Sequence, residues 1–384
     1  MKRLSICIFS AYYLPHLGGV ESYTSNLALA LLDLGHEITI VTSSDKNRRP
    51  EIRDKVRVVS IPSVSFMEDR FPIIVPCASF KKTLNELEGS SFDIVLINTR
   101  YYPLCLLGLR VSVNNGVTPL VVDHSSGYLS DESGAIGCLM RVYERAMTRK
   151  MVNSGARFYS VSAKSAAWLS ELGIEVQGLL PNAVDADLFV SSASQKKWRS
   201  ELNVTEKEIV VVYAGRLIEE KGVGLLIDSI DEVAPSLPIR LVIAGDGPLR
   251  AEVERRSGKK AIDYVGPLSK SDLSALMRDG DVFCLPTVYP EGLPTVMLEA
   301  AAQSMGLLVS NTGGTDEIVP SGRFGIVLDE VSVSGIIAGL ERYCFDRDYL
   351  IAAGAAARKN VLQNYSWAKT ADRLLQGYLK MMKE

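Results

Sequence analysis

Short apolar runs that end in turn-forming residues alternate with helical patterns along almost the whole chain. The strands predicted in the first half are residues 4–10, 38–41, 56–61, 93–98, 119–123 and 157–161. Between the first two of these, leucines and alanines at helical spacing predict a helix over residues 20–34. Strands separated by helices are typical of parallel βαβ units, so we expect a doubly wound sheet.

The second half of the chain repeats this pattern. Its predicted strands are IVVVYAG (209–215), IRLVIAG (239–245), AIDYVG (261–266), DVFCLP (281–286) and GLLVSN (306–311). A chain of 384 residues is too long for one compact core. We therefore predict an α/β protein of two Rossmann-like doubly wound domains, residues 1–185 and 186–365, joined by a linker near 181–194. The two domains are expected to face each other across a cleft that holds the site.

Composition and charge exclude several classes of protein. The net charge of -3 and the pI of about 5.8 give no electrostatic support to nucleic-acid binding. No apolar run approaches the roughly 18 residues that span a bilayer. The start, MKRLSICIFSAYYLP, lacks a small-x-small cleavage site, and the six cysteines form no C-x-x-C pair. A soluble cytoplasmic protein with reduced cysteines is expected.

Neither half carries a G-x-G-x-x-G after its first strand. The nearest approach, GDGPLR at 245–250, lacks the third glycine and follows a later strand. This pattern disfavours a nicotinamide or flavin oxidoreductase, and no Walker A motif is present.

A pair of cations follows the first strand of the second half, in AGRLIEEKG. Arg216 lies on the loop at the carboxyl end of that strand and Lys221 five residues on. Ligands of open α/β sheets bind at this edge, and a guanidinium with an ammonium can converge on one diphosphate. The alternative is a solvated Arg-Glu-Glu-Lys surface turn.

Two glutamates at a spacing of eight, Glu291 and Glu299, bracket a turn in YPEGLPTVMLEA. Pro294 suits the first turn of a helix, whose free N–H groups at residues 295–297 would form an anion site. Two carboxylates beside a diphosphate are favourable if they bind hydroxyl groups, Glu299 a ribose and Glu291 the sugar. The alternative is a capping Glu291 and a surface Glu299, although an unpaired charge inside VMLEAAA would be costly.

PEGLPTVMLEA resembles the E-x7-E motif of the retaining glycosyltransferases of family 4, which have the GT-B fold. The resemblance covers the whole chain in order: PHLGGVESY resembles the first glycine loop, AGRLIEEKG the diphosphate clamp, IAGDGPLR and NTGGTDEIV the later glycine turns, and YSWAKTADRLL the closing helix. It implies that the closing helix, 366–384, crosses back onto the first domain.

The resemblance also implies a role for individual residues of the second domain. Arg216 and Lys221 would bind the donor diphosphate, with Glu299 on the ribose and Glu291 on the transferred sugar. The remaining donor contacts would be backbone groups, at Leu268 beside the base and at Leu293, Pro294 and Thr295 beside the phosphates.

In the first domain the resemblance points to two loops. Gly18 and Gly19 would bring a backbone amide against the diphosphate, where a side chain would block the approach. His124 matches a histidine beside the reacting sugar; the alternative is a hydrogen-bonded loop histidine. The acceptor is expected on this domain, where residues 66–82 and the basic face of RVYERAMTRK (141–150) would meet an anionic bilayer. A merely solvated basic helix face is the alternative.

Two details of the linker bear on this interpretation. The family usually has P-N-G-V-D there, whereas this chain has Ala183 at the glycine position. If that position needed positive φ, alanine would be strained and the turn would differ. The D-x-D at 185–187, a metal signature of another glycosyltransferase fold, is interpreted as chance, so no metal and no cofactor are expected.

The predicted reaction is sugar transfer with retention from a nucleoside-diphosphate sugar, a UDP-sugar being favoured, to an acceptor hydroxyl of a glycan or lipid-linked acceptor. No carboxylate is placed as a nucleophile, so front-face attack assisted by the leaving phosphate is favoured. Two alternatives stay open: a hydrolysing nucleotide-sugar 2-epimerase, and a catalytically inactive nucleotide-sugar-binding subunit.

Overall fold

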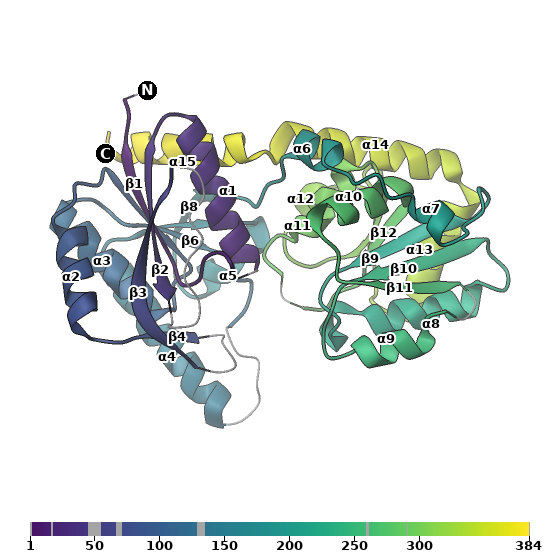
Figure 1. Ribbon diagram of the computed structural model, residues 1–384, viewed down its shortest axis with the longest axis horizontal. Helices are drawn as coiled ribbons and strands as arrows, with labels where there is room; N and C mark the ends of the chain where they lie inside the picture. The colour runs from purple at the N-terminus through teal and green to yellow at the C-terminus, as the bar shows by residue number, and fades with distance from the viewer. Residues whose placement is uncertain are drawn as a thin grey trace. The chain divides into compact units, whose positions relative to one another are not determined.

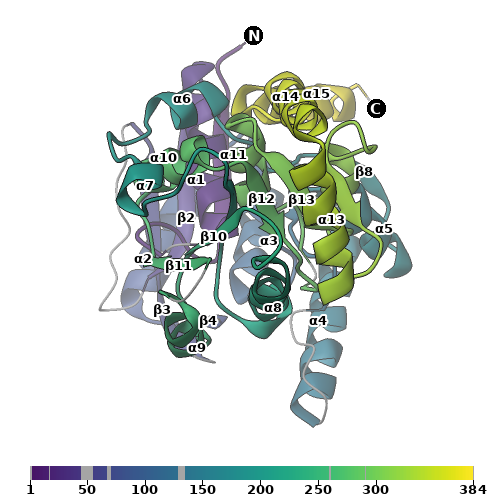
Figure 2. The same ribbon diagram turned by 90° about the vertical axis from the view of Figure 1, so that its right-hand side faces the viewer.

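The computed structural model describes residues 2–16, 18–44, 55–66, 71–128, 135–258, 261–289 and 291–383. The chain divides into two compact units (Figures 1 and 2). Unit 1 consists of Met1–Asn182 and Trp367–Glu384, and unit 2 consists of Ala183–Ser366. The division falls inside the segment expected to be the linker, three residues before the expected domain boundary.

The sheet of unit 1 has the order β4-β3-β2-β1-β5-β6-β7-β8 over the described residues, and only β3 and β4 pair antiparallel. Its strands are β1 (Ser5–Ser10), β2 (Glu37–Ser44), β3 (Arg57–Phe66), β4 (Phe71–Ile74), β5 (Ile94–Asn98), β6 (Leu120–Asp123), β7 (Arg157–Ser160) and β8 (Val176–Leu179). The six strands predicted for this half lie at their expected places, whereas β4 and β8 were not predicted.

Helices cover both faces of this sheet, which explains why its central strands are apolar throughout. The helices are α1 (Gly19–Asp33), α2 (Ala78–Glu88), α3 (Pro103–Asn115), α4 (Ala135–Asn153), α5 (Ala163–Glu171) and α15 (Trp367–Met381). In Figure 1, α2 and α3 lie on one side of the central strands and α1 on the other.

The sheet of unit 2 is parallel, in the order β11-β10-β9-β12-β13-β14. Its strands are β9 (Ile209–Ala214), β10 (Ile239–Ala244), β11 (Ile262–Gly266), β12 (Val282–Leu285), β13 (Gly306–Ser310) and β14 (Ile326–Leu328). Its helices are α6 (Ala186–Ser191), α7 (Trp198–Glu201), η1 (Glu219–Lys221), α8 (Val223–Val233), α9 (Arg250–Arg256), α10 (Lys270–Asp279), α11 (Thr295–Ala302), α12 (Thr315–Ile318), α13 (Val333–Phe345) and α14 (Arg347–Asn364). Two parallel α/β sheets confirm the fold class; the short β14 was not predicted.

The C-terminal helix α15 packs on α1 within unit 1. Its apolar face is buried at Ala371, Leu374 and Leu375. The Trp367 ring meets that of the buried Tyr23 edge-on, with the ring centroids 5.4 Å apart. An amphipathic helix needs such a covering surface, and α1 provides it.

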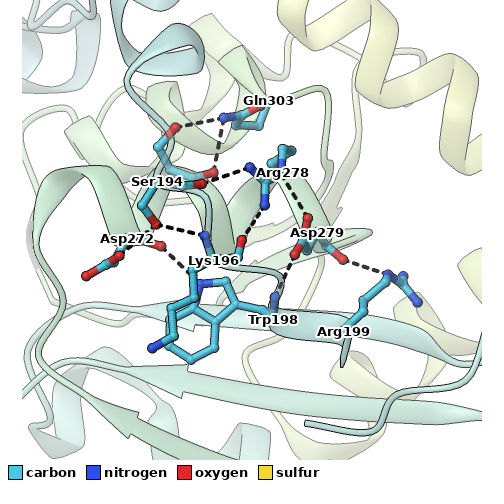
Figure 3. Close-up of polar contacts among 9 residues, drawn as sticks. Ser194, Lys196, Trp198, Arg199, Asp272, Arg278, Asp279 and Gln303 are labelled. Carbon is cyan, nitrogen blue, oxygen red and sulfur yellow. Dashed lines mark hydrogen bonds and ion pairs between the residues drawn. The ribbon is translucent and has the colours of Figure 1, made fainter. Parts of the chain in front are cut away.

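Most of the segment expected to be a linker is packed into unit 2. Residues of α6 and its approach are buried in the core, and the stretch 194–199 is fastened to α10 (Figure 3). Ser194 Oγ donates to Asp272 Oδ1 at 2.7 Å, and the Trp198 amide donates to Asp279 Oδ2 at 2.7 Å. Hydrogen bonds therefore hold this stretch against α10, and it is not a free connection.

Candidate functional site

The predicted second-domain residues gather at the carboxyl ends of β9 and β12. These strands are neighbours, and the chain leaves β9 toward β10 on its other side. This is a topological switch point, where the loops of an open parallel sheet separate and leave room for a ligand. Arg216 follows β9, and Glu291 follows β12.

The turn after β9 is docked onto the segment after β12 by backbone geometry. The Glu220 carbonyl accepts hydrogen bonds from the Val288 amide at 2.8 Å and the Thr287 hydroxyl at 3.0 Å. Gly222 lies in the left-handed region, with φ of 72°, and a Cβ there would collide with the Pro286 carbonyl. Only glycine permits this approach, which places Lys221 beside the β12–α11 loop.

Lys221 and Glu291 form an ion pair between Nζ and Oε1. Both side chains are largely buried, at 18% and 14% exposure, and the ammonium lies 5.5 Å from the centre of the Tyr289 ring. Arg216 is exposed, and its guanidinium has no partner among the described residues. The sequence predicted the convergence of these groups on a ligand, but not that Lys221 and Glu291 pair with each other.

The helix α11 begins one residue later than expected. Pro294 is its N-cap rather than its first helical residue, and the Met297 amide donates to the Pro294 carbonyl at 3.2 Å. The expectation of three free N–H groups is therefore wrong for Met297. The amides of Thr295 and Val296 have no hydrogen-bond partner among the described residues, which leaves two donors at the helix start.

Glu299 lies just over one turn into α11, half-buried, and its carboxyl group has no hydrogen-bond or ion-pair partner among the described residues. Burial raises its pKa from 4.5 to about 7, opposed by the charge of Lys270. An ionised carboxyl group without a partner on an apolar, partly buried helix costs free energy, unless a ligand provides hydrogen-bond donors to it. Glu299 is thus half-buried, whereas the alternative interpretation expected a glutamate on the surface.

Glycine-mediated contacts hold two further loops around this point, the loop after β10 and the loop after β13. Gly245 and Gly247, both with positive φ, lie where a Cβ would collide with the backbone of the loop after β9. Gly313 lies equally close to the backbone of Glu291 and Gly292. The two glycine turns seen in the sequence thus pack against the loops that carry Arg216 and Glu291. Leu268, between β11 and α10, is half-buried against the core of unit 2.

In unit 1, Gly18 caps the N-terminus of α1 and Gly19 is its first residue. The backbone of Gly18 is extended, a conformation open to any residue, and a Cβ there would meet the carboxylate of Glu21. A Cβ at Gly19 would meet nothing within 4 Å. The Glu21 carboxylate is the end of a flexible side chain and can move aside, so packing within unit 1 requires glycine at neither position.

His124 follows β6 and lies beside the end of β5. Its Nε2 is 3.3 Å from Asn98 Oδ1, and its ring meets that of Tyr23 edge-on at 4.6 Å between centroids. Burial lowers the pKa of His124 to about 4, so the ring is neutral at neutral pH. Both interpretations of this residue fit these facts, because a neutral imidazole held in place can also face a substrate.

A buried cluster beside His124 was not predicted. Arg100, fully buried, forms ion pairs with Asp123 and Glu144 and donates to Ser125 Oγ at 2.7 Å. The preceding residue, Thr99, has a φ of 68°, which is rare for a β-branched residue. The only sequence signal was an arginine directly after an apolar strand.

The two linker details have local explanations. Ala183 is buried and is absent from the residues with positive φ, so the family's glycine position carries no backbone strain here. Asp185 caps α6 by accepting from the Leu188 amide at 3.1 Å. Within the part of the chain that the structure describes, no group of three or more potential ligands could hold a metal ion.

Two family models match the chain in succession. Residues 17–188 match the model described as Glycosyltransferase Family 4, and residues 194–360 match the model described as Glycosyl transferases group 1. The matches meet close to the division between the two units.

Similar proteins extend the match to the full length. The GPI3 subunit of the Saccharomyces cerevisiae phosphatidylinositol N-acetylglucosaminyltransferase is 24% identical over 97% of this chain and 82% of that relative. Sucrose-phosphate synthase from Thermosynechococcus elongatus superposes with a TM-score of 0.73, at 20% identity over 99% and 100% of the two chains. The Anabaena protein HepE in complex with UDP-glucose gives 0.71, at 16% identity over 97% and 99%.

Proposed function

Because the chain is a glycosyltransferase of the family 4 type with the GT-B fold, we propose that it transfers a sugar with retention from a UDP-sugar to a hydroxyl group of a lipid-linked or glycan acceptor. The observation that carries the proposal is the convergence after β9 and β12. It brings two cations, two glutamates and the start of α11 to one edge of the sheet of unit 2.

The pairing of Lys221 with Glu291 suggests how the donor is received. A diphosphate carries more negative charge than one carboxylate, so it competes for the ammonium. Lys221 then turns to the phosphates together with the free Arg216, and Glu291 is released to accept hydrogen bonds from sugar hydroxyls. Until the donor binds, the ion pair keeps both side chains in place and avoids an uncompensated buried charge.

The leaving group determines the rest of the mechanism. As the anomeric bond breaks, charge develops on the diphosphate, and Arg216, Lys221 and the amides of Thr295 and Val296 lie where they would stabilise it. These groups remove the need for a metal ion. We favour front-face attack, in which the leaving phosphate accepts the acceptor's proton and the configuration is retained.

The choice of a UDP-sugar and of a lipid-linked acceptor is supported by the relatives. A structural neighbour binds UDP-glucose, and several curated relatives are N-acetylglucosaminyltransferases of phosphatidylinositol. Some of these relatives are named as subunits of their enzymes. A lipid whose headgroup is a cyclic polyol or a glycan fits both the names of these relatives and the proposed transfer to a hydroxyl group.

Unit 1 presents a surface suited to a membrane that carries such an acceptor. The rings of Phe71 on β4 and Tyr143 on α4 lie 5.6 Å apart, so the β3–β4 hairpin and α4 are adjacent. Exposed apolar side chains on these two elements are Val64, Phe66, Ile73, Leu139 and Val142. The same helix, α4, also carries arginines, and their positive charge favours contact with an anionic membrane surface. Arg70, part of the segment 66–82, lies outside the described residues. No helix in the described part of the chain is long and apolar enough to cross a bilayer.

A thermal-shift panel with EDTA tests the donor site. UDP, GDP, ADP, dTDP and their sugars are added to the wild type and to Glu299→Ala. A ligand at 100 times its Kd adds about 2.7 kcal/mol of stability. Stabilisation of the wild type by one nucleotide family, and its loss in the variant, supports the proposal. Absence of any shift without metal contradicts the clamp.

Product analysis separates the alternatives. With UDP-N-acetylglucosamine and phosphatidylinositol vesicles, NMR of the new anomeric proton should show an α-linked product. A β-linked product or a trapped glycosyl-enzyme adduct contradicts front-face retention. Release of an epimerised free sugar without acceptor supports the 2-epimerase, and nucleotide binding without any turnover supports the inactive subunit.

A further inference from the structure

The imidazole of His124 is one end of a hydrogen-bond chain inside unit 1. The chain runs from His124 Nε2 to Asn98 Oδ1 over 3.3 Å, and from Asn98 Nδ2 to Thr24 Oγ1 over 2.7 Å. It continues from the Thr24 hydroxyl to Ser10 Oγ over 3.0 Å, and from the Ser10 hydroxyl to the carbonyl oxygen of Tyr12 over 2.8 Å. The three side chains in the middle of the hydrogen-bond chain are no more than 1% exposed, so water does not compete for their partners.

The carbonyl group at the far end fixes the direction of every donor in this hydrogen-bond chain. A carbonyl oxygen only accepts, so the Ser10 hydroxyl gives its proton to Tyr12, and its oxygen is left to accept from Thr24. The other contact of the Thr24 hydroxyl, the Val20 carbonyl oxygen at 2.8 Å, is also a pure acceptor. Whichever of the two receives the Thr24 proton, Thr24 Oγ1 is the acceptor of the hydrogen bond with Asn98.

This direction assigns the tautomer of His124. The amide group of Asn98 is placed with Nδ2 as the donor to Thr24, which leaves Oδ1 facing the ring. Because Oδ1 carries no proton, Nε2 must be the protonated nitrogen of the imidazole. Burial lowers the pKa of His124 to about 4, so the ring holds only this one proton at neutral pH. Nδ1 is therefore a bare hydrogen-bond acceptor.

A ligand can reach Nδ1 of His124. This atom has no hydrogen-bond partner among the described residues, and it is not one of the unpaired polar atoms that they shield from solvent. The residue as a whole is partly exposed. A bare ring nitrogen repels the oxygens of an ionised phosphate or carboxylate and attracts a group that donates a proton. Hydroxyl groups, which both a sugar and a polyol carry, are donors of this kind.

The backbone of His124 is fixed by a separate set of contacts. The residues on either side of it, Asp123 and Ser125, both accept hydrogen bonds from Nη1 of Arg100, at 2.6 and 2.7 Å. The Ser125 amide in turn donates to Asp123 Oδ1 at 2.9 Å. With the loop held by Arg100 and the ring held by Asn98, Nδ1 has one orientation before a ligand arrives, which lowers the entropic cost of binding.

We propose that Asn98 is a positioning residue. As the last link of the hydrogen-bond chain that starts at the Tyr12 carbonyl, it holds His124 in the Nε2–H tautomer, and Nδ1 then accepts a hydrogen bond from a hydroxyl group of a bound sugar or polyol. The tautomer does not depend on the proposed function. The source of the hydroxyl group rests on the proposed function, which offers two, the donor sugar and the acceptor.

NMR of the intact protein, with ¹⁵N in the histidine rings, tests the tautomer. Correlations from the ring carbon protons show which nitrogen carries the proton, and His124→Gln assigns the signals. Asn98→Leu removes the acceptor of the Nε2 proton at similar volume. Thr24→Val removes the hydroxyl that orients Asn98, and Thr24→Ser, which keeps that hydroxyl, is its matched control.

In the wild type and in Thr24→Ser we expect one tautomer, with a visible Nε2 proton because its hydrogen bond slows exchange with water. In Asn98→Leu and in Thr24→Val the two ring nitrogens should share the proton, so that their resonances move toward each other and the proton signal is lost. A proton on Nδ1 of the wild type overturns the proposal. A spectrum of Asn98→Leu that matches the wild type overturns it as well.

The same spectra identify the source of the hydroxyl group. UDP, UDP-glucose, UDP-N-acetylglucosamine, and UDP together with myo-inositol are added in turn to the wild type. We expect the Nδ1 resonance to shift with a nucleotide sugar if the donor provides the hydroxyl group, and only with myo-inositol if the acceptor provides it. An Nδ1 resonance that no probe moves, or that UDP alone moves to the same extent, overturns the ligand contact.

A thermal shift with UDP measures the donor site and the folding of each variant separately. UDP should stabilise the wild type and the three variants of Asn98 and Thr24 alike. If UDP does not stabilise the wild type, the donor site of the proposed function is refuted, and the tautomer observed before any probe is added still decides the role of Asn98.

Discussion

The affinity for a nucleotide sugar should depend on pH through Glu299. Burial raises the pKa of its carboxyl group to about 7. A carboxylate that accepts hydrogen bonds from a ribose diol is stabilised in its charged form, so its pKa in the complex returns toward the usual range. Binding therefore selects the ionised carboxylate and releases a proton from the fraction of molecules that hold one.

The size of this pH effect on affinity follows from the Glu299 pKa of about 7. At pH 8 about nine tenths of the carboxyl groups are ionised in the free protein, and at pH 6 about one tenth. The affinity should therefore fall roughly tenfold from pH 8 to pH 6, equivalent to about 1.4 kcal/mol. At pH 7 about half a proton should be released for each ligand bound.

Calorimetry with UDP-glucose in two buffers of different ionisation enthalpy measures both quantities. A nucleotide sugar is preferred to UDP because its diphosphate is esterified at both ends and does not titrate in this range. Glu299→Gln is the matched variant, since it keeps the size of the side chain and cannot ionise. We expect weaker binding that no longer depends on pH over this range.

A flat affinity of the wild type between pH 6 and pH 8 would refute this reasoning. Stability gives an independent check with a defined sign. The folded state binds more protons than the unfolded state between pH 4.5 and about 7, so the raised pKa lowers stability as pH rises through that window. Glu299→Gln should be more stable than the wild type at pH 8, by up to about 3 kcal/mol, and not at pH 4.5.

Three further predictions concern the frame of the two sites. Gly222→Ala forces a Cβ against the Pro286 carbonyl at positive φ. Denaturant unfolding should therefore show a free energy of unfolding about 2–4 kcal/mol lower than in the wild type. In the control Gly224→Ala the new Cβ meets nothing within 4 Å, so the free energy of unfolding should not fall. Arg100→Met leaves two buried carboxylates without their cation and should lower the free energy of unfolding by about 3–5 kcal/mol. A decrease of less than about 1 kcal/mol would show that the cluster is solvated. The His124 ring should stay neutral in NMR spectra from pH 8 down to about 5.5, with His124→Gln assigning its signals, and a midpoint near 6.5 would contradict its burial.

The prediction from sequence was strongest where a pattern is local. Apolar runs ending in turn residues located the central strands, since strands buried on both faces need little else. It failed for β4, β8 and β14, which are short edge strands of the two sheets and are not buried along their whole length. Such strands form because a neighbouring strand offers hydrogen bonds, so no pattern in their own local sequence predicts them.

The site shows the same limit. Arg216, Lys221 and Glu291 were found because each lies in a segment between a strand and the next helix, and Glu299 because of its spacing of eight from Glu291. Their mutual arrangement was not accessible, since the pairing of Lys221 with Glu291 depends on the docking of two loops 70 residues apart in sequence.

The Arg100 cluster was missed for a related reason. Its three charged members come from the loop after β5, from β6 and from α4, so each looks isolated along the chain.

The packing of α15 on α1 has a consequence for the order in which the chain folds during synthesis. Unit 2 is continuous, Ala183–Ser366, and can close once its last residue has left the ribosome. Unit 1 begins the chain but keeps part of the α1 surface, including Tyr23, uncovered until Trp367–Met381 emerges. Of the two units, the one whose synthesis starts earlier is thus completed later, and a chain that lacks α15 exposes the apolar surface of α1 that this helix covers.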